Sequence, residues 1–155
     1  MSGFDILIDK ELENLDIQNF FAEIFKLSVT EVIVVEDIVS PHADAKCEIF
    51  CVKHKLGGMF SLCLELFISN NLKANIDDRE IIGQLSDKLD CKCLISDDSI
   101  NPFTFILVTG VSKYYAVSIE PDGLDIGEYN IVEYKDKIEL LSVVASKNKD
   151  DDKCD

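Results

Sequence analysis

Apolar positions in the first part of the chain follow a helical pattern and then an extended one. From Ile17 to Phe25 apolar residues recur at i, i+3, i+4, i+7 and i+8, which places them on one face of a helix. Asp16 precedes this stretch and is a candidate N-cap, because a side-chain carboxylate there can accept a free backbone N–H of the first turn. The β-branched run Val32–Val35 then predicts a buried strand.

Two more apolar runs predict a hairpin. Cys47–Val52 and Met59–Ile68 each have the composition of a strand, and Leu56-Gly57-Gly58 lies between them. Glycine adopts the positive φ angles that tight hairpin turns require. In the second run alternate residues are apolar and are expected to share one face of the sheet: Phe60, Leu62, Leu64, Leu66 and Ile68.

A second helix and three more strands follow. Asp77 and Glu80 form a D-x-x-E variant of the capping box at the start of the helix. Its apolar face consists of Ile81, Ile82, Leu85 and Leu89. The three predicted strands are Cys91–Ser96, Phe103–Val108 and Tyr114–Glu120, with Gly110 as the hairpin turn between the last two.

The pattern beyond residue 120 predicts fewer elements. Residues 120–123 have the composition of a turn, and Asn130–Tyr134 predicts a short strand. A third helix is predicted next, capped by Asp136 and Glu139 and with Ile138, Leu141 and Val144 on its apolar face. Residues 1–146 are expected to form a single domain, and residues 147–155 a charged, disordered tail.

These elements predict an α+β fold in the order α-β-β-β-α-β-β-β, followed by a strand or helix. Antiparallel sheet pairing with the helices on one face is expected. Residues 16–68 and 77–120 match at a shift of 61 residues, which aligns Asp16 with Asp77 and Pro41 with Pro102. An internal duplication of an α-β-β-β unit explains this match. Coincidence between generic helix and strand patterns is the alternative.

Composition indicates a folded protein with reduced cysteines. The chain has 155 residues, of which 47% are hydrophobic and 29% charged, enough for one core. The six cysteines lie mostly in strand-like runs, where thiols pack as small hydrophobes. The start of the chain, residues 1–5, has neither the basic segment nor the long apolar run of a signal peptide, so a cytoplasmic location is expected.

Charge changes this picture most. Thirty acidic residues face fifteen basic ones, a formal charge of −15, and Arg79 is the only arginine. Such a field repels nucleic acid and anionic membranes, so neither is an expected partner. It attracts basic protein surfaces. Solubility alone is the alternative explanation for the carboxylates.

Catalytic and metal-binding patterns are weak, so we expect no enzyme, no cofactor and no metal site. Cys47 and Cys51 would lie about 13 Å apart along one strand. Cys91 and Cys93 share a strand face and with a histidine could bind zinc, but the paired C-x₂-C spacing of zinc ribbons is absent. The chain contains no G-x-S-x-G, P-loop or EF-hand motif.

The carboxylates are therefore the candidate recognition residues. The predicted partner-binding set is Glu36, Asp37, Asp97, Asp98, Glu120, Asp122, Asp125 and Glu128. If the duplication holds, Glu36-Asp37 and Asp97-Asp98 follow equivalent strands. Phe103, Tyr114 and Tyr115 are candidate apolar anchors, although each also fits a core position.

The stretch from residue 80 to 124 carries a resemblance. A helix is followed by CKCLISDD (91–98), by NPF (101–103) and by a hydrophobic hairpin. This order resembles immunity proteins of bacterial polymorphic toxin and contact-dependent growth inhibition systems. The resemblance implies a cytoplasmic protein that binds and blocks one cognate toxin domain, expected here to be basic.

Two other functions remain open. A small acidic secretion chaperone would hold a client segment and would be a dimer, whereas a nucleic-acid mimic would bind several basic proteins. For an immunity protein a monomer is favoured over a homodimer.

Overall fold

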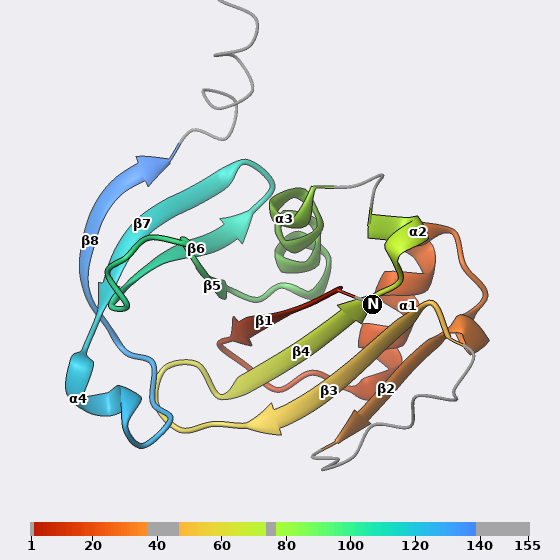
Figure 1. Ribbon diagram of the computed structural model, residues 1–155, viewed down its shortest axis with the longest axis horizontal. Helices are drawn as coiled ribbons and strands as arrows, with labels where there is room; N and C mark the ends of the chain where they lie inside the picture. The colour runs from red at the N-terminus through yellow and green to blue at the C-terminus, as the bar shows by residue number, and fades with distance from the viewer. Residues whose placement is uncertain (1, 37–46, 74–76, 139–155) are drawn as a thin grey trace, which may run out of the picture.

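The computed structural model describes residues 2–36, 47–73 and 77–138, and its strands form one sheet (Figure 1). The strand order is β2-β3-β4-β1-β5-β6-β7-β8; β2 and β3 are parallel, and every other neighbouring pair is antiparallel. The predicted α+β class is confirmed. The strands are β1 (Ser2–Ile8), β2 (Val32–Glu36), β3 (Ile49–Lys55), β4 (Leu62–Ile68), β5 (Cys93–Ser96), β6 (Thr104–Gly110), β7 (Lys113–Ile119) and β8 (Ile131–Ile138).

Two 12-residue helices cover one face of the sheet, as the sequence predicts. Their apolar stripes pack with alternate strand residues into the main core, in which Phe21, Leu64 and Leu85 are fully buried. Gln18 adds a polar contact between the first helix and the sheet, because its side-chain amide donates a hydrogen bond to the Val32 carbonyl at 2.9 Å. The helical segments are α1 (Asn14–Phe25), the 3₁₀ turn η1 (Val29–Glu31), α2 (Asn70–Lys73), α3 (Asp78–Leu89) and α4 (Pro121–Leu124).

Strand β1 is absent from the sequence-based prediction, yet it lies in the middle of the sheet. It pairs with β4 along its whole length and with β5 at two positions only. Its buried residues Ile6, Leu7 and Ile8 face alternately the helix-covered core and a second core on the opposite side. Gly3 and Asp5 interrupt its apolar run, and both residue types are depleted in strands, so the local pattern carries little signal.

Three details of the prediction are wrong. Helix α1 begins at Asn14 with Glu13 as N-cap, so Asp16 lies inside the first turn. Phe60 packs in the second core and does not share the face of Leu62 and the residues that follow it. Asp136 lies within β8 and does not cap a helix; the remainder of that predicted helix falls outside the described residues.

The two matching stretches differ in topology. In the first, the strand after the helix runs parallel to its neighbour β3; in the second, β5 runs antiparallel to β6. Following the pairings across the sheet, β2 and β5 therefore point in opposite directions. At the shift of 61 residues β2 coincides with β5 but runs in the opposite direction. Strands β3 and β4 fall on residues 110–116 and 123–129, which match neither β6 nor β7.

The sheet folds over on itself. Five strands separate β3 from β8, yet the β3–β4 hairpin touches the segment that leads into β8. Gly57 forms a bridge with Glu128, and the Met59 amide donates to Asn130 Oδ1 at 2.8 Å. Gly58 supplies the positive φ of 78° that this turn needs. The closure creates a concave face opposite the helices (Figure 1).

Candidate functional site

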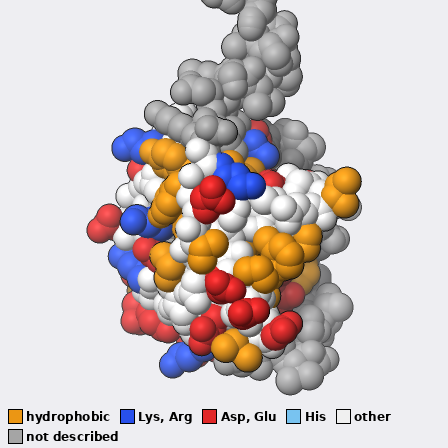
Figure 2. Space-filling view, turned by 90° about the vertical axis from the view of Figure 1, so that its left-hand side faces the viewer, with side chains coloured by type: hydrophobic (Ala, Val, Ile, Leu, Met, Phe, Trp, Pro, Cys, Tyr) orange, Lys and Arg blue, Asp and Glu red, His pale blue; other side chains and the backbone are white. Residues whose placement is uncertain are grey.

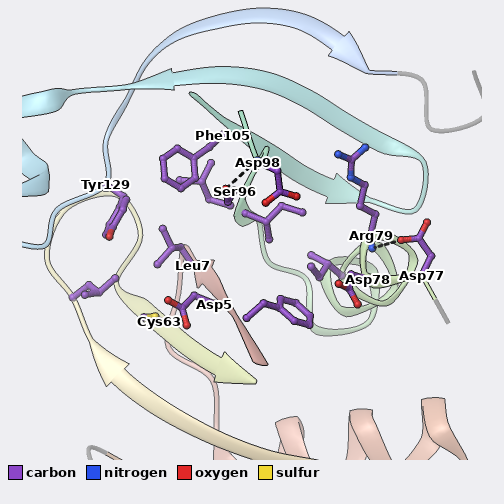
Figure 3. Close-up of a pocket in the computed structure, with 15 residues that line it drawn as sticks. Asp5, Leu7, Cys63, Asp77, Asp78, Arg79, Ser96, Asp98, Phe105 and Tyr129 are labelled. Carbon is purple, nitrogen blue, oxygen red and sulfur yellow. Dashed lines mark hydrogen bonds between the residues drawn. The ribbon is translucent and has the colours of Figure 1, made fainter. Parts of the chain in front are cut away.

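The concave face contains a cleft of about 580 Å³ between the two halves of the sheet (Figure 3). Its apolar lining comes from both halves and from the loop before β8: Leu7, Leu56, Leu94, Phe105 and Tyr129. Its charged lining consists of Asp5, Asp77, Asp78, Arg79 and Asp98. The combination of an apolar floor and a few charged groups is typical of ligand-binding cavities.

The cleft exists because β1 and β5 separate. Their pairing is limited to Leu7 with Leu94 and Ile8 with Cys93. Beyond these pairs β5 ends at Ser96, and Asp98 takes a left-handed conformation with φ of 61° while its amide donates to Ser96 Oγ at 3.1 Å. The chain thus turns away from β1, and the N-terminal turn of α3 borders the resulting opening (Figure 3).

Asp5 is the carboxylate on the β1 wall of the cleft. It lies directly opposite Glu65 on β4, and His54 Nε2 is 2.8 Å from Glu65 Oε1. Desolvation and the like charge of Glu65 raise the pKa of Asp5 above its ordinary 3.8, against a smaller lowering by His54. A raised pKa means that folding favours the protonated form of Asp5. Ionisation of Asp5 therefore lowers the free energy of unfolding as the pH rises above its ordinary pKa of 3.8.

Tyr129 and Phe105 form the aromatic part of the cleft. Their rings meet edge to face with centroids 6.0 Å apart. Burial raises the pKa of Tyr129, with smaller contributions from Cys63 and Asp5. Burial, Asp5 and Glu65 raise the pKa of Cys63 to about 12, so this thiol stays protonated at neutral pH and is a poor nucleophile.

A second surface surrounds α4 and contains four of the predicted carboxylates. Glu120 caps the helix by accepting the Asp122 amide at 3.0 Å, and Glu128 packs so closely that a Cβ on Gly123 would lie 2.8 Å from the Glu128 carbonyl oxygen. Glu120 thus stabilises the loop through its side chain, whereas Glu128 does so through its backbone, whose amide donates to the Gly123 carbonyl at 2.8 Å. Asp122 and Asp125 are exposed and available to a partner.

Exposed apolar side chains lie on the same part of the fold. Ile126 follows α4 and is 70% exposed, and Val132 and Tyr134 on β8 are 59% and 58% exposed. Figure 2 views this side of the molecule and shows hydrophobic side chains beside a group of carboxylates. We call Asp122, Asp125, Ile126, Val132 and Tyr134 the α4–β8 surface.

The remaining predicted residues are divided among separate places. Glu36 lies on edge strand β2, 3.6 Å from Lys53, whereas β8 forms the opposite edge. Because β2 and β5 run in opposite directions, Glu36 and Asp97 do not follow equivalent strands. Asp97 accepts the Ser99 amide at 3.0 Å; partial burial raises its pKa, but hydrogen bonds with Ser99 and Thr104 outweigh this and lower it overall. Asp37 lies outside the described residues.

The three anchor candidates differ in exposure. Tyr114 is fully buried, and its hydroxyl donates to the Arg79 carbonyl at 2.9 Å, so it ties β7 to α3. Tyr115 packs partly buried against the second core. Phe103 is exposed at the start of β6, beside the fully exposed Ile100.

Cysteine chemistry contributes no site. Cys51 is buried, and burial raises the pKa of its thiol far above the ordinary range. The Cys91 and Cys93 sulfurs are 4.0 Å apart and buried. In the described part of the chain, no three histidine, cysteine or carboxylate side chains converge closely enough to hold a metal ion. Nor does any helix there have the length and apolar character to span a bilayer.

Comparison with protein-family models, with curated proteins and with solved structures found no match to this chain.

The sequence-based candidates include Asp98, which lines the cleft, and the α4 carboxylates, but the cleft itself was not predicted. Asp5 belongs to a strand that was not predicted, and Phe105 and Tyr129 lie 24 residues apart, in segments that meet only when the sheet folds over. A single polar residue, Asp5, within the apolar run FDILI was the one available signal.

Proposed function

We propose that this protein is an immunity protein that binds and neutralises a basic bacterial toxin domain through its α4–β8 surface. The observation that carries the proposal is the position of exposed apolar side chains beside exposed carboxylates in one surface. Carboxylates steer a basic partner into contact, and apolar or aromatic side chains stabilise the complex once water is excluded. The chain's charge of −15 adds long-range attraction.

Strand β8 adds a second mode of contact. Among the described strands it is the last in the sheet and pairs only with β7. A partner strand that pairs with such an edge gains backbone hydrogen bonds, while flanking side chains provide specificity. Val132 and Tyr134 would flank such a strand, and Asp122 and Asp125 would meet basic residues beside it.

The immunity function predicts that a large secreted protein ending in a toxin domain is encoded immediately upstream of this chain, and the test uses that toxin domain. Co-expression with this chain should restore growth, and the purified proteins should form one complex. The double substitution Asp122→Asn with Asp125→Asn should slow association about tenfold at low ionic strength and less at physiological salt, since exposed charges are screened.

Glu11→Gln with Asp16→Asn is the matched control. It removes the same charge from exposed positions before and within α1, so it should change association by less than twofold. Equal slowing by both variants would assign the effect to net charge and overturn the α4–β8 surface as the contact. Failure of the chain to restore growth would overturn the immunity function.

The same binding experiment separates the alternative functions. A nucleic-acid mimic would bind several unrelated basic proteins with similar affinity. A secretion chaperone would sediment as a dimer and bind an extended segment of its client. Tight binding of one folded toxin domain by a monomer is the result expected here.

A further inference from the structure

We propose that the cleft between the two halves of the sheet binds a small organic cation, an ammonium group carried on an aromatic or aliphatic body. This inference goes beyond the proposed function and does not depend on it, because the cleft is lined by residues outside the α4–β8 surface. It rests on the size of the cavity, the sign of its charge and the position of its aromatic rings.

The cavity has the size and lining of a small-molecule site. Its volume of about 580 Å³ falls within the range of roughly 300–1,000 Å³ found for ligand pockets. Its floor is continuous with the second core, where Leu7 and Leu94 are buried. An apolar ligand body placed on this floor would leave water, which is favourable at roughly 25 cal/mol per Å² of buried area.

The charged lining selects a cation. Four carboxylates and one guanidinium border the cleft. The Asp77 carboxylate already accepts the Arg79 amide at 3.0 Å as the N-cap of α3, so part of its hydrogen-bonding capacity is used within the protein. Asp5 and Asp98 border the cleft from its two halves, on β1 and after β5, and both are positioned to meet an ammonium group.

Asp5 has a specific reason to favour a cation. It is directly opposite Glu65, and two like charges at such a position destabilise a sheet. Burial, and then the like charge of Glu65, raise the pKa of Asp5, and His54, which contacts Glu65, lowers it by less. A bound ammonium group beside Asp5 would compensate the negative charge that the fold leaves in excess.

The aromatic rings support the same ligand. Phe105 and Tyr129 line the side of the cleft across from α3, and Asp5 and Cys63 line its floor side (Figure 3). Aromatic faces attract cations by about 0.5–2 kcal/mol, and more strongly when water is excluded. A neutral ligand could donate at most an uncharged hydrogen bond to the carboxylates, which is weaker than a charge-assisted one from an ammonium group, and anions would be repelled by them.

The experiment compares three probes of similar shape. 2-Phenylethylamine carries the cation, 2-phenylethanol is its neutral counterpart, and 3-phenylpropionate is an anion. Titration of the full chain, followed by calorimetry and by the NMR signals of Tyr129, should show the amine binding at least tenfold tighter than the alcohol and no binding of the anion. Equal affinity for amine and alcohol, or no binding of the amine, would overturn the proposal.

Two cleft variants and one control locate the site. Asp5→Asn should abolish the preference for the amine over the alcohol, and Phe105→Ala should weaken both ligands. Glu11→Gln removes the same charge at an exposed position outside both the cleft and the α4–β8 surface, and it should leave both affinities unchanged. Asp5→Asn is expected to fold, since the raised pKa of Asp5 shows that its ionised form costs stability at neutral pH. A preference that survives Asp5→Asn, or one that disappears in Glu11→Gln, would overturn the assignment.

The ammonium group could belong to a free amine or to a lysine side chain of a protein. Nα-acetyl-lysine amide is the probe that separates these sources. Tighter binding of 2-phenylethylamine indicates a free amine, and tighter binding of the lysine derivative indicates a protein lysine. Both results support an organic cation site.

Discussion

At the residue scale, the most informative side chain is a lysine that the fold buries. Lys53 is 8% exposed and lies on β3, which is otherwise apolar over Ile49–Val52. Its ammonium donates to the Leu12 carbonyl at 2.6 Å and to Asn14 Oδ1 at 2.8 Å. Lys53 thus links the connection between β1 and α1 to the sheet. Its ammonium also lies 3.6 Å from the Glu36 carboxylate, so this carboxylate already has an ion-pair partner within the fold.

Replacing this lysine tests that role. Lys53→Met keeps most of the side-chain volume but leaves the Leu12 carbonyl without its donor, so it should lower the free energy of unfolding by about 2–3 kcal/mol. Lys55→Met, at the exposed end of the same strand, should change it by less than about 0.5 kcal/mol. Urea denaturation followed by circular dichroism measures both. Equal stability of the two variants would show that these hydrogen bonds contribute nothing.

At the element scale, the helix ends show which features of a helix the local sequence pattern predicts. Asp77 is the N-cap of α3, as its D-x-x-E pattern predicts. Helix α1 has no side-chain cap and ends at Lys26 in the left-handed conformation, with φ of 57° and ψ of 48°. Helix α3 also ends on a left-handed non-glycine residue, Asp90, with φ of 52°, so the two helices differ at the N-terminal end. Without a side-chain cap there, the stability of α1 depends on the burial of Ile17, Phe20 and Phe21.

The end of α1 can be improved by one substitution. Lys26→Gly should raise the free energy of unfolding by about 1 kcal/mol, since a left-handed residue with a Cβ costs about 1–2 kcal/mol. Lys26→Ala retains the Cβ and should give no gain. Thermal and urea unfolding of the two variants provide the measurement. A gain of the same size in Lys26→Ala would show that removal of the lysine side chain, and not the backbone conformation, is responsible.

Prediction from sequence was accurate wherever burial is one-sided. The strand faces of Leu62–Ile68 and the helix stripes are confirmed, because one face of each is apolar. Both hairpins are confirmed as well, although β3 is buried on both faces over Ile49–Val52. In the second hairpin, Gly110 pairs with Lys113, and the positive φ of 62° belongs to Ser112. β1 was missed because Gly3 and Asp5, residue types that strands disfavour, interrupt its apolar run. The parallel pairing of β2 with β3 has no local signature.

At the scale of the whole molecule, charge and topology act together. A charge of −15 repels itself in the compact state, although it also attracts basic partners. The folded-over sheet brings several carboxylates to the cleft and others to the α4–β8 surface. The proposed cation ligand and the proposed basic partner would each compensate part of this charge.

Salt should therefore stabilise the isolated protein. Raising sodium chloride from about 10 mM to about 150 mM shortens the screening length to about 8 Å and should increase the urea midpoint. A variant with four exposed carboxylates neutralised should respond less: Glu11→Gln, Asp16→Asn, Asp122→Asn and Asp125→Asn. A midpoint that falls with salt, or an equal response in both proteins, would show that self-repulsion is not significant.

The sequence by itself determined the α+β class, the two amphipathic helices, the one-sided strands and the strongly negative charge, because these follow from composition and from local periodicity. Only the tertiary structure decided which carboxylates already have partners within the fold. It also decided where β1 inserts in the sheet, and that β1 and β5 separate to open a cleft. These features depend on contacts between residues far apart in the chain, such as Asp5 with Glu65 and Phe105 with Tyr129. Pairing across such distances leaves no periodic trace in the sequence.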